Sequence, residues 1–420
     1  MLSNKKFLRL LRITLLGVCS SMAIAPLVSK PVLAAKAAET QKVSAKVGKP
    51  LKQARELMDA KKWKEALEKT KEAAAVEGKN PTEEALVNEM LAFCMINLKD
   101  YTNAVAVYET MLAAGQFKKE DEPKRILNMS QIYFALKNYP KSIELGERYL
   151  KVAGSDLEVM RQISQAYYLQ NNFARAADYA QRLIDSAKKQ GKAVEEDWLQ
   201  LLMSCQHKQN KKVEVVSTLE QLLTLYPNEK YWSDMFTYLL QGSSFSDRQN
   251  IIYLRLVKQA NMLQPDEYVE LAELSLAVTN PGDAKAILEE GFSKGVLGKN
   301  QSKDRDLKLL NMAKTQVAED LKLLPSIEKE ALAKPTGDAL VKVGEAWLGH
   351  GHYENAIAAF SKGLAKGGLK IQDETNINAG IAYLGLNKPD EAIKAFNAVP
   401  ASSSLALMSR LWVIQAKASH

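Results

Sequence analysis

An aromatic residue followed three residues later by alanine or serine returns about every 34 to 39 residues along the chain. It stands at Tyr101–Ala104, Tyr139–Ser142, Phe173–Ala176 and Tyr353–Ala356. Amphipathic helical stretches lie on both sides of each copy. Because a single helix pair cannot bury its apolar face alone, this period predicts pairs that stack on their neighbours. We expect a protein built in this way to work through an extended surface rather than a chemical pocket.

The clearest copy runs from Asp338 to Leu369. Its first helix is expected to carry Gly344 and Trp347, and its second helix Ala356 and Phe360. The small residues stand where the two helices cross closely, while the aromatic rings fill the space on either side. This arrangement resembles a tetratricopeptide repeat.

Five further segments fit the same frame: Ala54–Ala66, Ala92–Tyr108, Ser130–Ser142, Ser164–Ala176 and Gly380–Phe396. Spacing alone predicts four more pairs: Met203–Pro227, Trp232–Met262, Ala272–Leu288 and a degenerate pair over Lys303–Ala333. The fold class is therefore all-α, a tetratricopeptide-like α-solenoid of about ten antiparallel helix pairs. A last helix over Ser402–Ala418 is expected to cap the stack. We divide the chain into a signal peptide (1–34), a flexible lead-in (35–49), an N-terminal array (50–262) and a C-terminal array with the capping helix (263–420).

The signal peptide is predicted from four basic residues followed by an apolar run from Ile13 to Val28. Small residues before Ala35 favour cleavage between Ala34 and Ala35. An uncleaved membrane anchor is the alternative, although the run contains Pro26 and is shorter than the roughly 20 apolar residues that a span needs. After cleavage we expect no integral membrane span.

The net charge of the chain does not change the predicted fold or function. Residues 1–34 contain 5 of the 57 basic residues and no acidic ones, so the remaining chain has 52 against 49 and a net charge of +3. A nearly neutral chain gives no electrostatic reason to expect nucleic acid as a partner. Cys94 and Cys205 are too few for a disulfide framework and are expected to be small core residues.

Candidate chemistry is sparse. The four histidines are His207, His350, His352 and His420. The stretch from Gly349 to His352 could hold a metal between two imidazoles, but it falls in a turn where glycine is expected. We therefore predict no catalytic residue, no metal and no cofactor, and a protein that is not an enzyme. A glycan-active or small-molecule enzyme on a helical toroid is a further alternative, which would need a convergent pair of acids that the repeats do not supply.

The inner face of the first helices is the predicted binding surface. Aromatic side chains there can bury a partner's apolar groups, while glutamine and arginine hydrogen-bond its backbone or carboxylates, which suits a protein or peptide partner. The alternative is that the polar members are merely solvated and that Phe93 and Phe134 belong to the core. The predicted residues are Phe93, Gln131, Phe134, Arg161, Gln165, Tyr168, Gln200, Ser204 and His207.

The stretches Leu225–Trp232, Gly291–Leu297 and Gly363–Leu369, together with the signal peptide and the repeats, resemble the periplasmic tetratricopeptide proteins encoded beside TonB, ExbB and ExbD systems of Gram-negative bacteria. The resemblance implies a periplasmic location and an accessory role in TonB-dependent uptake, with periplasmic domains of TonB or ExbD as partners. The alternative is an envelope factor for assembly, secretion or polysaccharide export.

Overall fold

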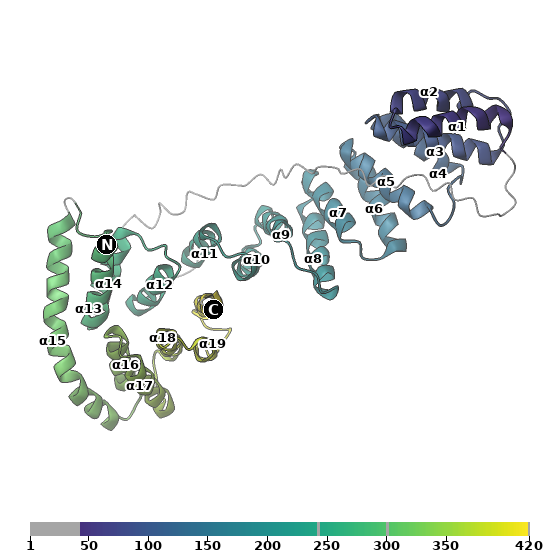
Figure 1. Ribbon diagram of the computed structural model, residues 1–420. Helices are drawn as coiled ribbons and strands as arrows, with labels where there is room; N and C mark the ends of the chain where they lie inside the picture. Colours follow the sequence, from purple (N-terminus) through teal and green to yellow (C-terminus); the bar gives the residue numbers. More distant parts are fainter. Residues whose placement is uncertain (1–42, 242–243, 300–301, 419–420) are drawn as a thin grey trace. The chain divides into compact units, whose positions relative to one another are not determined.

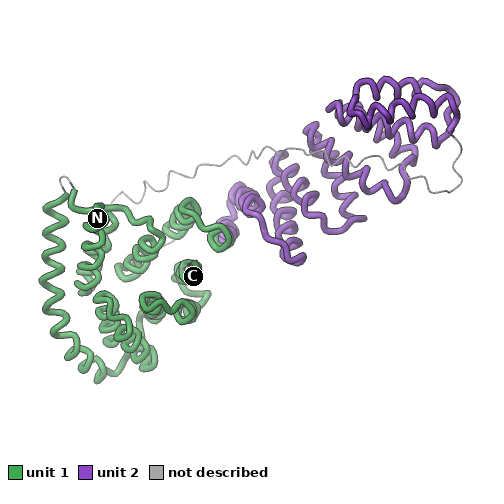
Figure 2. The backbone as a smooth tube through the Cα atoms, in the orientation of Figure 1, with its two compact units in different colours: residues 1–15, 219–420 green, residues 16–218 purple. Residues whose placement is uncertain are grey.

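The computed structural model describes residues 43–241, 244–299 and 302–418, and these contain twenty helices and no strand (Figure 1). The predicted signal peptide and His420 lie outside these ranges. The described residues divide into unit 2, with residues 43–218, and unit 1, with residues 219–418 (Figure 2). The all-α fold class is confirmed. None of the described helices has both the length and the apolar character needed to cross a membrane.

Unit 2 begins with α1 and ends within α10. Its helices are α1 (Ala45–Asp59), α2 (Trp63–Ala74), α3 (Pro81–Asn97), α4 (Tyr101–Ala113), α5 (Glu122–Ala135), α6 (Tyr139–Ala153), α7 (Leu157–Leu169), α8 (Phe173–Lys189), α9 (Glu196–Lys208) and α10 (Lys212–Leu225).

Unit 1 starts in the last turns of α10 and contains the remaining ten helices. These are α11 (Glu229–Gln241), α12 (Asp247–Gln259), α13 (Pro265–Ala277), α14 (Pro281–Ser293), α15 (Lys303–Ala333), α16 (Asp338–Gly349), α17 (Tyr353–Lys366), α18 (Gln372–Gly385), α19 (Pro389–Asn397) and α20 (Ala406–Ala418).

Eight helix pairs share one turn of three residues between the first and the second helix. The middle residue of each turn has a positive φ, a left-handed conformation that ends a helix sharply. Its amide bonds back to the preceding helix, as from Lys61 to the carbonyl of Met58 at 2.9 Å. These middle residues are Lys61, Lys99, Lys137, Asn171, Asn210, Thr279, Gly351 and Asn387.

The predicted close crossing of the two helices is confirmed in unit 1. A Cβ on Gly344 would lie 2.5 Å from the ring of Phe360, and one on Gly380 would lie 2.3 Å from that of Phe396. No larger side chain fits there without displacing the ring. Unit 2 uses a polar version, in which Ser164 Oγ donates to the carbonyl of Ala176 at 2.8 Å. Small residues twelve positions apart thus set the crossing point.

Some predicted boundaries differ from the structure. The degenerate pair predicted over Lys303–Ala333 is wrong, because these residues form the single 31-residue helix α15. The described helices therefore make nine pairs, counting α11 with α12, plus α15 and α20. Helix α1 starts at Ala45, so the last five residues of the predicted lead-in are helical. The units divide after residue 218, whereas the sequence placed the boundary of its arrays after residue 262.

Candidate partner-binding face

Direct contacts between first helices occur at two steps of unit 2. Helix α1 contacts α3, and α7 contacts α9, whereas no comparable contact joins α2, α4, α6 and α8 within the described residues. Because a curved stack brings its elements closest on the concave side, we infer that the first helices form that side, and we call it the inner face. All nine predicted binding residues belong to the first helices α3, α5, α7 and α9.

The structure brings the predicted residues of α7 and α9 together. The hydroxyl groups of Tyr168 and Ser204 are 2.9 Å apart and share a hydrogen bond. About two helical turns before this hydrogen bond, Arg161 Nη1 on α7 lies 3.8 Å from Asp197 Oδ2 on α9. The Nη2 of Arg161 also donates to Glu158 Oε2 within α7 at 2.8 Å. The side chain of Arg161 is 21% exposed, so it remains accessible to a partner.

Three predicted residues offer polar groups to solvent along the same two helices. Gln165 and Gln200 are half-buried, and His207 is exposed. The Gln200 amide donates to Glu196 Oε1 at 3.4 Å within α9. Amide side chains of this kind can donate to and accept from an extended backbone.

The aromatic members behave differently from one another. Phe93 packs in the core of the first pairs, with its ring 5.7 Å from that of Trp63. Phe134 is half-buried, and its ring lies 5.6 Å from that of Tyr139. Gln131 lies one turn before Phe134 on α5 and is also half-buried. Phe93 therefore contributes to the core, and Phe134 and Tyr168 pack against core clusters while each stays partly exposed.

Arg161 also belongs to a set of four charged residues on these first helices, and sequence reasoning missed the other three. Glu89, Arg125, Arg161 and Asp197 follow one another at intervals of 36 residues. Glu89 pairs with Arg125, as Arg161 does with Asp197, so each ion pair joins two successive first helices. The Arg125 side chain is 11% exposed, and burial lowers the pKa of its guanidinium. The recurrence of charge at the repeat period was the signal that could have revealed this set.

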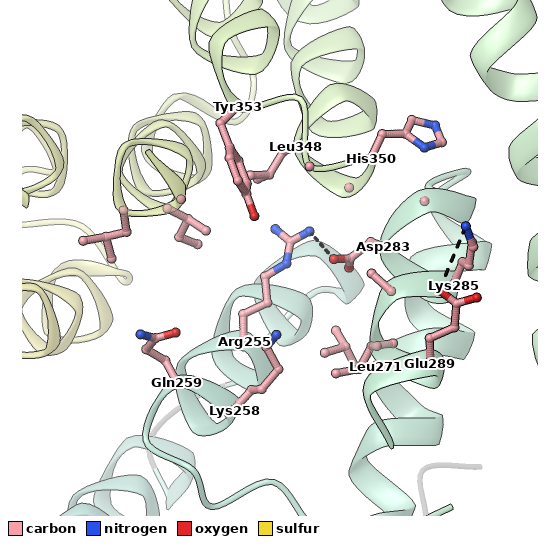
Figure 3. A pocket seen from close by; sticks show the side chains of 18 of the residues that line it. Arg255, Lys258, Gln259, Leu271, Asp283, Lys285, Glu289, Leu348, His350 and Tyr353 are labelled. Carbon is pink, nitrogen blue, oxygen red and sulfur yellow. Dashed lines mark ion pairs between the residues drawn. The ribbon is translucent and has the colours of Figure 1, made fainter. Parts of the chain in front are cut away.

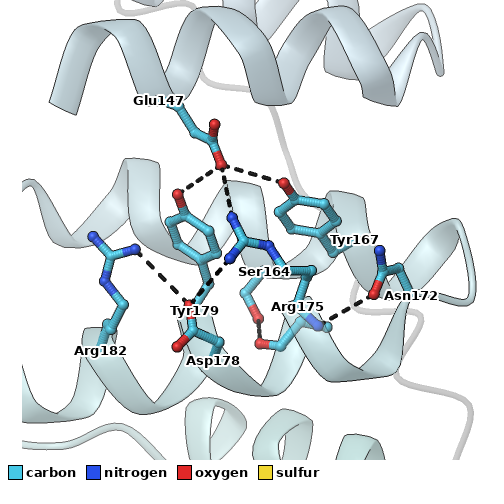
Figure 4. A network of polar contacts seen from close by, with 9 residues as sticks. Glu147, Ser164, Tyr167, Asn172, Arg175, Asp178, Tyr179 and Arg182 are labelled. Atoms are coloured by element: carbon cyan, nitrogen blue, oxygen red, sulfur yellow. Dashed lines mark hydrogen bonds and ion pairs between the residues drawn. The ribbon is translucent and has the colours of Figure 1, made fainter. Parts of the chain in front are cut away.

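A second network of polar contacts connects the helix pair α5–α6 to the pair α7–α8, both of which contribute residues to the inner face (Figure 4). Glu147 Oε1 on α6 accepts from the hydroxyl groups of Tyr179 at 2.8 Å and Tyr167 at 3.2 Å. The guanidinium of Arg175 lies 5.4 Å from the centre of the Tyr167 ring, and that of Arg182 lies 4.6 Å from the Tyr179 ring. Burial, and then Glu147, raise the pKa of Tyr179 to about 12, so this hydroxyl remains a donor. The network joins α6 to α7 and α8 and holds their spacing.

The histidines considered as metal ligands have other neighbours. His350 Nε2 lies 2.6 Å from Asp320 Oδ2 of α15, and the His352 ring packs against Trp347 with centres 5.4 Å apart. Among the described residues, no three side chains of histidine, cysteine, aspartate or glutamate gather as a metal site would require. Cys94 and Cys205 are free and buried, as predicted.

Comparison with known proteins gives structural likeness only. No family model matches the chain, and no curated protein matches it. A tetratricopeptide repeat protein from Parabacteroides merdae is 13% identical, with a TM-score of 0.34 over 81% of this chain and 99% of that one. MamA from Desulfovibrio magneticus is 16% identical, with a TM-score of 0.34 over 44% of this chain and 97% of that one. Part of a TPR repeat-containing protein from Cytophaga hutchinsonii is 16% identical, with a TM-score of 0.31 over 80% and 99%. At these TM-scores the likeness supports no argument about function, and the solenoid assignment follows from the helix pairs themselves.

Proposed function

We propose that the protein is a non-enzymatic interaction scaffold that binds a partner protein or peptide on the inner face of unit 2. The observation that supports this is the surface formed by α7 and α9, where Arg161, Gln165, Tyr168 and His207 lie on adjacent helices of one stack. Aromatic and amide groups on a rigid concave surface suit an extended or helical segment.

We further propose that the partner is a periplasmic domain of TonB or ExbD, and that the protein acts in the periplasm as an accessory component of TonB-dependent uptake. This part follows from the resemblance of Leu225–Trp232, Gly291–Leu297 and Gly363–Leu369 and from the predicted signal peptide.

The test measures binding of the purified protein to immobilised periplasmic domains of TonB and ExbD by biolayer interferometry. Gln165→Glu places a carboxylate on the inner face, and we expect it to change the affinity at least about fivefold, since one lost hydrogen bond is worth about 1 kcal/mol. Gln181→Glu is the matched control, because Gln181 is exposed on the second helix α8.

Binding by neither domain would contradict the TonB assignment. Equal effects of the two substitutions on a domain that does bind would contradict the inner face as the site. The two parts of the proposal can therefore fail separately.

A further inference from the structure

Unit 1 contains a cavity of about 440 Å³ that the repeat pattern did not predict (Figure 3). Its walls come from helices far apart in the sequence, including α12, α14, α16, α18 and α20. The volume falls within the range of about 300 to 1,000 Å³ that is typical of sites for small ligands. The cavity is therefore large enough for an organic molecule.

The walls are held in place by close contacts of glycine residues. A Cβ on Gly385 would lie 2.5 Å from the ring of Tyr353, and one on Gly282 would lie 2.5 Å from His350 Nδ1. A Cβ on Gly349 would lie 2.0 Å from the side chain of Asn280. The absence of side chains at these glycines lets α14, α16, α17 and α18 approach one another around the cavity.

Hydrogen-bond donors dominate one side of the cavity. Arg255 and Tyr353 point toward each other, and Lys258 and Gln259 extend from the same helix as Arg255 (Figure 3). Arg255 Nη2 contacts Asp283 Oδ1 at 2.9 Å and Nη1 donates to Asn378 Oδ1 at 3.3 Å. A guanidinium has five N–H donors, and these two contacts use two of them.

One further donor has no acceptor within the part of the chain that the structure describes. The hydroxyl of Tyr353 has no hydrogen-bond partner there, although the residue is half-buried and lines the cavity. A ligand that supplied an acceptor oxygen would satisfy this donor.

Three cations and two carboxylates line the cavity, namely Arg255, Lys258 and Lys285 with Asp283 and Glu289. Asp283 pairs with Arg255 and Glu289 with Lys285, whereas the partner of Lys258 is Glu290, which lies outside the lining. The α12 side of the cavity is therefore its positive side, which suits an anionic group.

The other walls are apolar. Leu271 and Leu348 line the cavity, together with Ile381, Leu384 and the side chain of Trp412. These side chains can bury the aliphatic or aromatic part of a ligand, because contact between the two apolar surfaces removes both from water.

We propose that this cavity binds a small amphipathic organic carboxylate. The carboxylate lies against Arg255, Lys258 and Tyr353. The apolar body lies along Ile381, Leu384 and Trp412. The site is separate from the inner face of unit 2, so this proposal can be tested independently of the proposed partner.

Isothermal titration calorimetry of the full chain with sodium decanoate tests the proposal, with 1-decanol as the uncharged comparison. We expect decanoate to bind at least about tenfold more tightly than 1-decanol, because a charge-assisted hydrogen bond is worth about 1.5 to 3 kcal/mol. Lys258→Gln should weaken decanoate about tenfold and leave 1-decanol unchanged. Leu384→Trp, which fills the apolar side, should abolish binding of both.

Lys362→Gln is the matched control, because Lys362 lies in the same unit, forms an ion pair with Glu328 at 3.2 Å and does not line the cavity. Circular dichroism of each variant checks that it folds, and Tyr353→Phe replaces Lys258→Gln if that variant does not. No decanoate binding, equal affinity for 1-decanol, or an unchanged affinity in the folded lining variant would each overturn the proposal.

Discussion

The two units use the same helix pair and differ in what they do with its inner surface. In unit 2 the first helices leave half-buried polar side chains accessible, as at Gln165 and Arg161. In unit 1 helix α12 contacts α18 and α20, more than 100 residues further along the chain. Eight successive residues of α12, from Asn250 to Val257, are buried. A repeat array therefore offers an open face only where its own helices do not return to cover it.

Helix α15 is the element by which unit 1 departs from the regular succession of helix pairs. At 1.5 Å per residue its 31 residues span about 46 Å, and it takes the place of a helix pair. Helix α14 contacts α16 directly, and Asn280 Nδ2 donates to the carbonyl of Glu345 at 2.9 Å. Because α15 packs beside this junction instead of separating it, α14 and α16 meet and the cavity forms next to them.

The largest expected difference between the units concerns ion pairs. Arg255→Met removes the partner of Asp283, whose side chain is only 16% exposed, and should lower the opening free energy of α12 and α14 by about 3 to 5 kcal/mol. In unit 2, Arg148→Met removes a pair with Glu122 in which both side chains are a third or more exposed, and should cost less than about 1 kcal/mol. Hydrogen exchange resolved by peptide measures both effects.

Similar losses in the two variants would show that the interior of unit 1 is as solvated as the surface of unit 2. The double variant Arg255→Met with Asp283→Leu separates charge from packing. It should recover most of the lost stability, because no buried carboxylate is then left without a partner.

A smaller effect is expected within the open unit. Tyr168→Phe removes the hydrogen bond to Ser204 and should lower the opening free energy of α7 and α9 by about 1 kcal/mol, with no change in unit 1. Tyr139→Phe is the control, because the Tyr139 hydroxyl has no hydrogen bond to the described residues, and it should stay within about 0.5 kcal/mol. If the two variants match, the α7–α9 contact does not depend on this bond.

The smallest effect separates the units by the direction of their pH dependence. Amide groups of Asn80 and Ser44 donate to the Glu83 carboxylate in unit 2 and hold its pKa below the ordinary value. In unit 1, burial raises the pKa of Glu345 although Arg248 opposes this shift. The stabilisation from ionised Glu83 is therefore present above its unfolded pKa, about 4.3, and is lost as pH falls through the lower folded pKa. For Glu345 the sign is opposite, and stability falls as pH rises from the unfolded to the raised folded pKa.

Thermal unfolding of Glu83→Gln and Glu345→Gln against the unsubstituted chain measures these slopes. The deficit of Glu83→Gln should shrink as pH falls. The thermal stability of Glu345→Gln should rise relative to that of the unsubstituted chain as pH rises. A deficit of Glu83→Gln that is independent of pH would mean that its carboxylate is not held ionised in the folded chain.

The helix pairs could be predicted from sequence because their packing is local. Gly344 with Phe360, and Gly380 with Phe396, recur at a fixed spacing that a single sequence displays. The sequence could not show that α15 lacks the turn expected between two helices. Lysine, asparagine, threonine and glycine all occupy the left-handed position in the turns of other pairs. Residue type therefore does not mark the turn.

The candidate sites divide in the same way. Tyr168 and Ser204 were predicted from their places on the first helices, and their separation by 36 residues is the period of the array. The cavity of unit 1 is lined by residues far apart in the sequence, and Arg255 of its lining donates to Asn378, 123 residues further along the chain. No periodicity connects such positions, so the sequence alone could not show that they meet.

The uniform three-residue turn determines where the chain can change length. At about 100° per residue, one inserted residue would rotate the second helix and turn its small crossing residue away from the first. The connections between successive pairs are less uniform, with three residues between Ala153 and Leu157 and eight between Ala113 and Glu122. Epitope tags, reporter domains and evolutionary insertions should therefore be tolerated between pairs and rejected within them.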